Sequence, residues 1–198
     1  MSLKIKSIKK NEYIEAISLQ YFIDELEEKV LKDILSSFSC KRNSDVENFI
    51  RSKAVSFEKN SWSKTFLFIH VNKNLGNKII GYVAISEKYI DVSSMKLSKT
   101  KKKNVKRKAY CIDDMSAIKT LLLGQVARND EYNSKLFNMD IVMDFMLKIS
   151  GDHGGLFPYH FMSLECDKNM MEFYERYGFK DTEISNMEKD LNLMIRNL

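Results

Sequence analysis

The sequence of 198 residues predicts an α/β fold in which a mixed sheet carries helices on both faces. In the first half of the chain, helical patterns precede two apolar strands joined by a turn, which is typical of an antiparallel hairpin. In the second half, strands and helices alternate, and this order predicts a right-handed crossover between parallel strands. A single sheet with both arrangements packs helices against its two faces.

The first sixty residues contain one predicted strand and two predicted helical regions. Leu3–Ile8 alternates apolar and polar residues and predicts a strand. Glu12–Leu35 carries apolar residues near a spacing of 3.6 and predicts a helix. Ser44 is a suitable cap for a second helix over Asp45–Phe57.

A hairpin and a long apolar strand are predicted in the middle of the chain. Thr65–Val71 is rich in aromatic and β-branched residues, and the turn sequence NKNLGNK joins it to an antiparallel partner at Lys78–Ile90. A basic segment at 92–115 interrupts the pattern. Ile118–Arg128 then predicts a strongly apolar strand.

The C-terminal part predicts two helices and two short strands. A helix is expected over Ser134–Ile149, ended by Gly151, and a strand over Phe161–Glu165. Asn169–Tyr177 predicts a helix that Gly178 stops, and the tail LNLMIRN predicts a last strand.

Composition excludes several classes of protein. No secretory signal is present, and no run approaches the roughly 20 apolar residues of a membrane span, so we expect a cytoplasmic protein without a membrane partner. Cys40, Cys111 and Cys166 are far apart and indicate reduced thiols. His153 and His160 lack partners at ligand spacing, so no metal is expected.

The basic residues are concentrated in one segment. The net charge is +5, and Lys96–Lys108 holds eight basic residues and no acidic residue. Two interpretations stay open: a solvated loop, or a surface that attracts the phosphates of a nucleic acid.

Three further stretches carry patterns that go beyond secondary structure. Residues 38–86 contain an aromatic-x-Cys sequence, a helix that ends in an alanine, and IIGY. Residues 121–132 read LLLGQVARNDEY, and residues 173–179 read FYERYGF, the most specific of the three. Together, over most of residues 38–198, they resemble the GNAT N-acetyltransferase superfamily, in particular its branch of aminoacyl-tRNA-acetylating toxins.

The resemblance implies a fold and a coenzyme. The fold would be a GNAT-like, mostly antiparallel central sheet with a splayed parallel strand pair, in a single domain over 1–198 with the basic insertion at 92–115. Acetyl-CoA would be the co-substrate, without a metal. Its pantetheine would pair with the strand edge at Val126, Ala127 and Arg128, where one amide would stabilise the oxyanion.

The resemblance also implies a phosphate site and a catalytic residue. Tyr174, the tyrosine of FYERYGF, would protonate the departing CoA thiolate as a general acid. Phe173 and Phe179 would pack in the core. The remaining coenzyme contacts would be the amides of Asn133, Ser134, Lys135, Leu136, Phe137 and Asn138 around the pyrophosphate, and Asn169.

The phosphate loop departs from the family pattern. The pattern is (Gln/Arg)-x-x-Gly-x-(Gly/Ala), whereas no glycine occurs between Gln125 and Ser150. A Cβ atom hinders close approach of backbone to phosphate, and Asp130 and Glu131 add like charge upstream. Either residues 133–134 still cap the helix while Lys135 supplies an ion pair, or coenzyme binding is weakened or lost.

No general base can be assigned from the sequence. Glu87, Asp113, Asp114 and Glu165 lie near strand ends, and the α-amine of an aminoacyl ester would hardly need a base. No covalent intermediate is required, so Cys166 is expected to be a buried thiol.

The sequence therefore predicts an acetyl-CoA-dependent N-acetyltransferase that acts directly on a primary amine. The acceptor is an aminoacyl-tRNA bound through Lys96–Lys108, or a small-molecule or protein amine. The alternative is a non-catalytic module that binds nucleic acid or protein on a degenerate GNAT scaffold. A homodimer is left open as an assembly.

Overall fold

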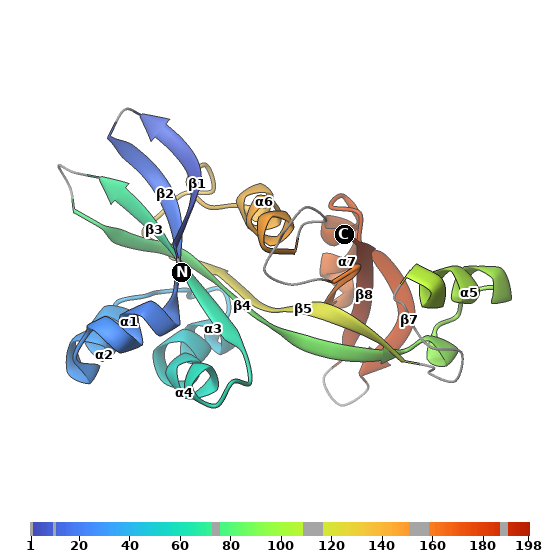
Figure 1. Ribbon diagram of the computed structural model, residues 1–198. Coiled ribbons are helices and arrows are strands. Elements are labelled where there is room, and N and C mark those ends of the chain that lie inside the picture. The colour runs from blue at the N-terminus through green and yellow to red at the C-terminus, as the bar shows by residue number, and fades with distance from the viewer. Residues whose placement is uncertain (1, 10, 73–75, 109–116, 151–158, 187–189) are drawn as a thin grey trace. The chain divides into compact units, whose positions relative to one another are not determined.

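A computed structural model describes residues 2–9, 11–72, 76–108, 117–150, 159–186 and 190–198 (Figure 1). Within these residues, eight strands form a sheet of order β1-β2-β3-β4-β5-β6-β8-β7. The chain divides into two compact units, residues 1–85 with 125–146 and residues 86–124 with 147–198. The predicted mixed, mostly antiparallel sheet is confirmed.

In the first unit, antiparallel pairs run from β1 to β4. The strands are β1 Ser2–Lys9, β2 Glu12–Ser18, β3 Lys64–Asn72 and β4 Lys78–Asp91, whose residues 78–85 belong to this unit. The predicted hairpin of β3 and β4 is confirmed, and its turn at 73–75 lies outside the described residues.

The helix predicted from Glu12 is wrong over its first residues. Glu12–Ser18 is strand β2, paired with β1 on one side and β3 on the other. Ile14, Ala16 and Ser18 are buried in alternation, so the segment follows the strand period of two. The apolar residues also satisfied a helical period, and pairing with two strands decides between the two patterns.

Short helices follow β2 in place of one long helix. They are α1 Leu19–Glu25 and α2 Glu28–Ser36, followed by α3 Ser44–Asn48, a π-helical turn at Phe49–Lys53 and α4 Ala54–Lys59. The second predicted helical region is confirmed, but its cap is not Ser44. Asn43 Oδ1 accepts from the amides of Asp45 and Val46 at 3.0 and 3.3 Å.

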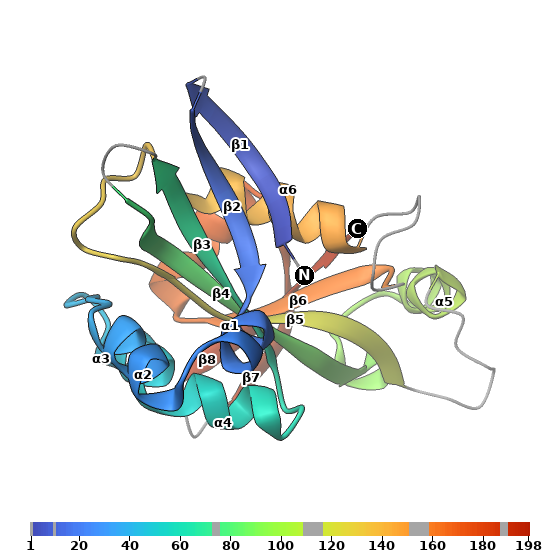
Figure 2. The ribbon, with the colours of Figure 1, turned by 60° about the vertical axis from the view of Figure 1, so that its left-hand side comes forward.

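Helices cover both faces of the first unit's strands (Figures 1 and 2). On one face, residues of α1, α2 and the segment 38–54 form a core with Leu67 and Tyr82 of the strands. On the other face lies α6, Met139–Ser150, where Phe145 contacts Phe66 and Phe68 with ring centroids 4.9 and 5.2 Å apart. The core strands thus sit between two helical layers.

The second unit contains the parallel strand pair. β5 Ala117–Arg128 runs parallel to β6 Phe161–Cys166, which pairs antiparallel with β8 Leu191–Asn197 and through it with β7 Lys180–Asn186. The strand β7 was not predicted. The parallel ladder joins Leu121–Leu123 to Met162–Leu164, and both strands continue beyond it.

The basic segment forms a helix that the sequence did not predict. After a short 3-10 turn at Val92–Ser94, α5 spans Lys99–Lys108, and residues 109–116 of the predicted insertion lie outside the described part. A second 3-10 turn, Lys168–Met170, leads into α7, Met171–Glu175. None of the helices in the described residues is long and apolar enough to cross a membrane.

Candidate functional site

The residues predicted to bind the coenzyme fall in both units. Val126, Ala127 and Arg128 end strand β5 within the first unit, together with the loop Asn133–Asn138. Asn129 follows the last residue of β5, and its amide donates to the Ile80 carbonyl of β4 at 2.9 Å. Ala127 is buried in the helix-covered core, whereas Val126 and Arg128 are half-buried.

The helix after the loop begins later than predicted. The sequence placed its start at Ser134, but α6 begins at Met139. Its cap is Asn138, whose Oδ1 accepts from the Ile141 amide at 3.1 Å. The expectation that residues 133–134 cap this helix is therefore wrong. Asn133 instead closes a local turn by accepting from the Lys135 amide at 3.0 Å.

Several loop amides donate no hydrogen bond within the described residues. The amides of Lys135 and Leu136 both bond to Asn133, so the turn consumes them. Within the described part of the chain, the remaining amides from residue 133 to residue 140 donate no hydrogen bond, and they belong to Asn133, Ser134, Phe137, Asn138, Met139 and Asp140. The last four surround the α6 N-terminus, where free N–H groups favour anions. The sequence prediction missed Met139 and Asp140, since it began the helix too early.

The loop is anchored to the sheet by Phe137. Its side chain is 2% exposed, and its ring centroid lies 4.9 Å from that of Phe68. The ring also covers Gly81 of β4 so closely that a Cβ atom there would lie 2.5 Å from Phe137 Cδ1 and Cε1. The glycine of IIGY thus makes room for an aromatic ring 56 residues later, counted from the two positions.

The carboxylate of Asp130, beside the loop, is hydrogen-bonded to the segment before α3. Its Oδ2 accepts from the Lys41 amide at 2.8 Å and from Ser39 Oγ at 3.2 Å, and its own amide donates to the Ser39 carbonyl. The Lys41 amide, with smaller contributions from Ser39 and nearby cations, lowers the pKa of Asp130. This carboxylate joins the end of β5 to the segment before α3, which accounts for an acidic residue here.

Tyr174 and Asn169 belong to the second unit. Asn169 is exposed in the 3-10 turn before α7. Tyr174 lies in α7 against Phe173 and Phe179, with centroids 5.2 and 6.0 Å away. Burial and then Cys166 raise the pKa of Tyr174, so its hydroxyl keeps its proton at neutral pH. Within the described residues this hydroxyl makes no hydrogen bond.

Cys166 is a buried thiol, as expected. Burial, followed by Asp167 and Asp181, raises its pKa to about 11. Its Sγ lies 3.7 Å from Met194 Sδ. A protonated thiol in apolar surroundings is a poor nucleophile.

Glu87, one of the candidate bases, forms an ion pair with Lys119. Its Oε1 accepts from Lys119 Nζ at 2.5 Å and from the Tyr159 hydroxyl. Hydrogen bonds from Lys119 and then from Tyr159 lower the pKa of Glu87. Burial, followed by the hydrogen bond to Glu87, raises the pKa of Tyr159 to about 12. A carboxylate with a lowered pKa is a weaker proton acceptor at neutral pH.

Glu165 is held in a second polar group of the same unit. Lys88 Nζ donates to Glu165 Oε1 at 2.9 Å, and both side chains are about one-third exposed. The Lys88 carbonyl accepts from Thr120 Oγ1 at 3.0 Å, and that hydroxyl lies 2.7 Å from Ser163 Oγ. Asp113 and Asp114 lie outside the described residues. The geometry in this unit does not single out a base.

The fold is similar to that of several solved structures, among them a bacterial toxin, KacT and AtaT. One is a bacterial toxin with a TM-score of 0.66 and 17% identity, over 93% of this chain and 90% of that one. A tyrosine-to-phenylalanine mutant of KacT gives 0.63 and 15%, over 95% of both chains. AtaT in complex with acetyl-methionyl-tRNAfMet gives 0.60 and 17%, over 82% and 86%.

The chain has the GNAT fold. No family model and no curated protein matches it by sequence. The resemblance to the GNAT superfamily and its toxin branch that the motifs indicated is confirmed at the level of the fold.

Proposed function

We propose that this protein is an acetyl-CoA-dependent N-acetyltransferase whose acceptor is the amine of an aminoacyl-tRNA. The observation that carries the proposal is the group of unbonded amides at Phe137–Asp140, which follows the core strand of a GNAT fold. A pyrophosphate would bind there without glycine, because the loop itself offers the N–H groups. AtaT, which has the same fold at 14% identity, has been solved with acetyl-CoA.

Groups of this chain can be assigned to the steps of the proposed reaction. The pantetheine would pair with the edge of β5 at Val126–Arg128, since the parallel ladder ends at Leu123. The acceptor amine attacks the thioester carbonyl, and one of these strand amides stabilises the oxyanion. The C–N bond forms as the C–S bond breaks. Tyr174 gives its proton to the thiolate, and the acceptor nitrogen loses one to solvent.

The role of Tyr174 rests on the FYERYGF motif and on its protonated hydroxyl. Asn169 remains proposed as a coenzyme contact on the resemblance alone. Lys135 would form an ion pair with a phosphate, since its side chain is exposed to solvent.

The acceptor assignment is supported by AtaT and by helix α5. AtaT has been solved with acetyl-methionyl-tRNAfMet. In α5, the side chains of Lys99, Lys101, Lys103, Lys106 and Arg107 have no carboxylate partner within the described residues. Such a surface favours a polyanion through counterion release. Small-molecule and protein amines are the competing acceptors.

The test is transfer of labelled acetyl from acetyl-CoA to charged tRNA, compared with uncharged tRNA, polyamines and peptides. We expect labelled product with charged tRNA only, at a rate that falls as salt rises. Salt-insensitive transfer to polyamines or peptides would instead identify a different acceptor.

Coenzyme binding is tested separately by thermal shift. Acetyl-CoA at 100 times its dissociation constant stabilises a binding protein by about 2.7 kcal/mol. No shift at millimolar acetyl-CoA would favour the non-catalytic alternative, in which the glycine-free loop has lost the coenzyme.

A further inference from the structure

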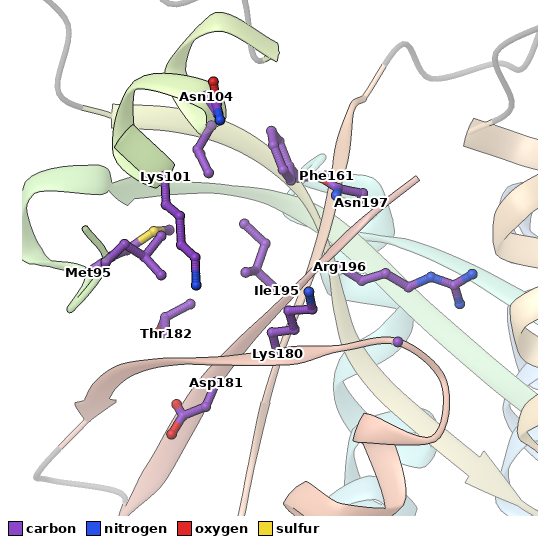
Figure 3. A pocket seen from close by; sticks show the side chains of 13 residues that line it. Met95, Lys101, Asn104, Phe161, Lys180, Asp181, Thr182, Ile195, Arg196 and Asn197 are labelled. Carbon is purple, nitrogen blue, oxygen red and sulfur yellow. The ribbon is translucent and has the colours of Figure 1, made fainter. Parts of the chain in front are cut away.

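The second unit contains a pocket of which the proposed function uses only one lining residue, Lys101 of the basic helix α5 (Figure 3). It has a volume of about 490 Å³ and lies between α5 and the strands β7 and β8. Small-molecule sites generally span about 300–1,000 Å³. The pocket is therefore large enough for an organic ligand rather than for an ion alone.

Three basic residues, Lys101, Lys180 and Arg196, and one acidic residue, Asp181, line this pocket, and the guanidinium of Arg196 extends away from the two lysines (Figure 3). Lys101 from α5 and Lys180 from β7 both project into the space between these elements (Figure 3). Within the described residues, neither lysine has a carboxylate partner or a hydrogen bond from its side chain. Two ammonium groups directed into one cavity repel each other, and an anion between them removes this cost.

The nearby charges do not neutralise the two lysines. Asp181 accepts from the Glu183 amide at 2.8 Å, and its carboxylate points away from Lys101 and Lys180 in Figure 3. Two other cations of the basic segment have partners of their own: Lys96 pairs with Glu183 at 3.2 Å, and Lys102 donates to the Ser93 carbonyl at 2.7 Å. The first turn of α5 carries no acidic residue that could offset the lysines.

The rest of the pocket suits a flat, mostly apolar group with polar edges. Its apolar lining consists of Met95, Leu97, Val105, Phe161 and Ile195, which belong to the core beneath α5. The side-chain amides of Asn104 and Asn197 also line the pocket, away from the lysine ammonium groups (Figure 3). Amides of this kind both donate to and accept from the edge of a base.

We propose that this pocket binds a nucleoside monophosphate group, with the phosphate between Lys101 and Lys180 and the base over the apolar lining. The ligand is a free nucleotide or the 5′-phosphorylated end of an RNA chain, which present the same chemistry. The site lies wholly within the second unit and does not depend on acetyl transfer.

Calorimetric titration with uridine 5′-monophosphate tests the site. Uridine is chosen because coenzyme A carries adenine, so that binding at the proposed acetyl-CoA site is avoided. We expect saturable binding, and binding of uridine or inorganic phosphate weaker by about tenfold or more, because each lacks half of the contacts. No saturation up to about 10 mM nucleotide, or equal affinity for inorganic phosphate, would overturn the proposal.

Three variants locate the binding. Lys101→Gln and Lys180→Gln should each weaken nucleotide binding by about tenfold, since each removes a charged hydrogen bond. Lys103→Gln is the matched control, because it removes the same charge from α5 at an exposed position outside the pocket. Equal weakening in all three variants would mean a diffuse charge effect and would contradict a pocket.

Competition distinguishes the two sources of the ligand. If a 5′-phosphorylated RNA trinucleotide displaces the mononucleotide more strongly than the unphosphorylated RNA does, the pocket takes an RNA end. If the mononucleotide alone binds, the pocket takes a free nucleotide. Displacement by both RNAs to the same extent would show that the terminal phosphate is not read and would refute the assignment.

Discussion

Replacement of Gly81 by alanine tests the anchoring of the phosphate loop. The new Cβ would lie 2.5 Å from Phe137 Cδ1 and Cε1 and 2.7 Å from Cζ. These distances are too short for any carbon contact, and the ring is buried against Phe68, so it must move. Because Phe137 belongs to the loop before α6, the loop has to move with it.

Two opposing effects determine how much Gly81→Ala changes the free energy of unfolding. Overpacking a core costs about 1–3 kcal/mol. Alanine in place of glycine in an ordinary backbone conformation stabilises by about 0.4–1 kcal/mol, because it lowers the conformational entropy of the unfolded chain. Gly81→Ala should therefore destabilise by up to about 2.6 kcal/mol. Each kcal/mol lowers Tm by about 2–4 °C in a chain of this size.

Urea denaturation of a double-mutant cycle measures this coupling. In the Phe137→Leu background the ring is absent, so Gly81→Ala should become neutral or stabilise by up to about 1 kcal/mol. If Gly81→Ala costs the same in both backgrounds, the glycine is not there to accommodate Phe137 and the reasoning is refuted. The single variant should also bind acetyl-CoA more weakly than the wild type, as thermal shift would detect.

Three further predictions concern the remaining sites. Tyr174→Phe should retain acetyl-CoA binding and slow acetyl transfer by about 10²–10⁴-fold; unchanged turnover would remove Tyr174 from its role. Asp130→Asn should lower Tm at neutral pH. Because the folded pKa of Asp130 lies below its unfolded value, that difference should shrink as pH falls through the folded value; a pH-independent difference would contradict the contacts with residues 39 and 41. Tyr159 has its pKa raised to about 12, so its contribution to stability is complete below about pH 10 and lost towards pH 12. Tyr159→Phe should flatten that part of the stability profile in denaturant titrations, and an equally steep loss in the variant would speak against it.

Several strands could be predicted from the sequence because each depends on a local pattern of apolar and β-branched residues. Thr65–Val71, Lys78–Ile90 and Ile118–Arg128 were each predicted within a few residues of the observed strands. Glu12–Ser18 was misassigned because its residues satisfy two periods at once, and only its two neighbouring strands select one. The sequence therefore predicted the fold class better than it predicted this element.

The site was predicted less completely, because its details depend on long-range contacts. Asn133 and Asn138 are both good caps in sequence, and the burial of Phe137 between them places the helix start after Asn138. The contact of Phe137 with Gly81 and the bond of Asp130 to Lys41 join distant segments, so no local pattern shows them. The FYERYGF motif gave Tyr174 as the proposed general acid, and that role stays a prediction.

Amide chemical shifts measured during titration with acetyl-CoA test the central claim most directly. If the loop binds the pyrophosphate, the amide resonances of Phe137, Asn138, Met139 and Asp140 should move in a saturable way, because their N–H groups gain charged acceptors. The amides of Lys135 and Leu136, which already bond to Asn133, should move less. Saturable binding that leaves residues 137–140 unperturbed, or no binding at all, would contradict the account.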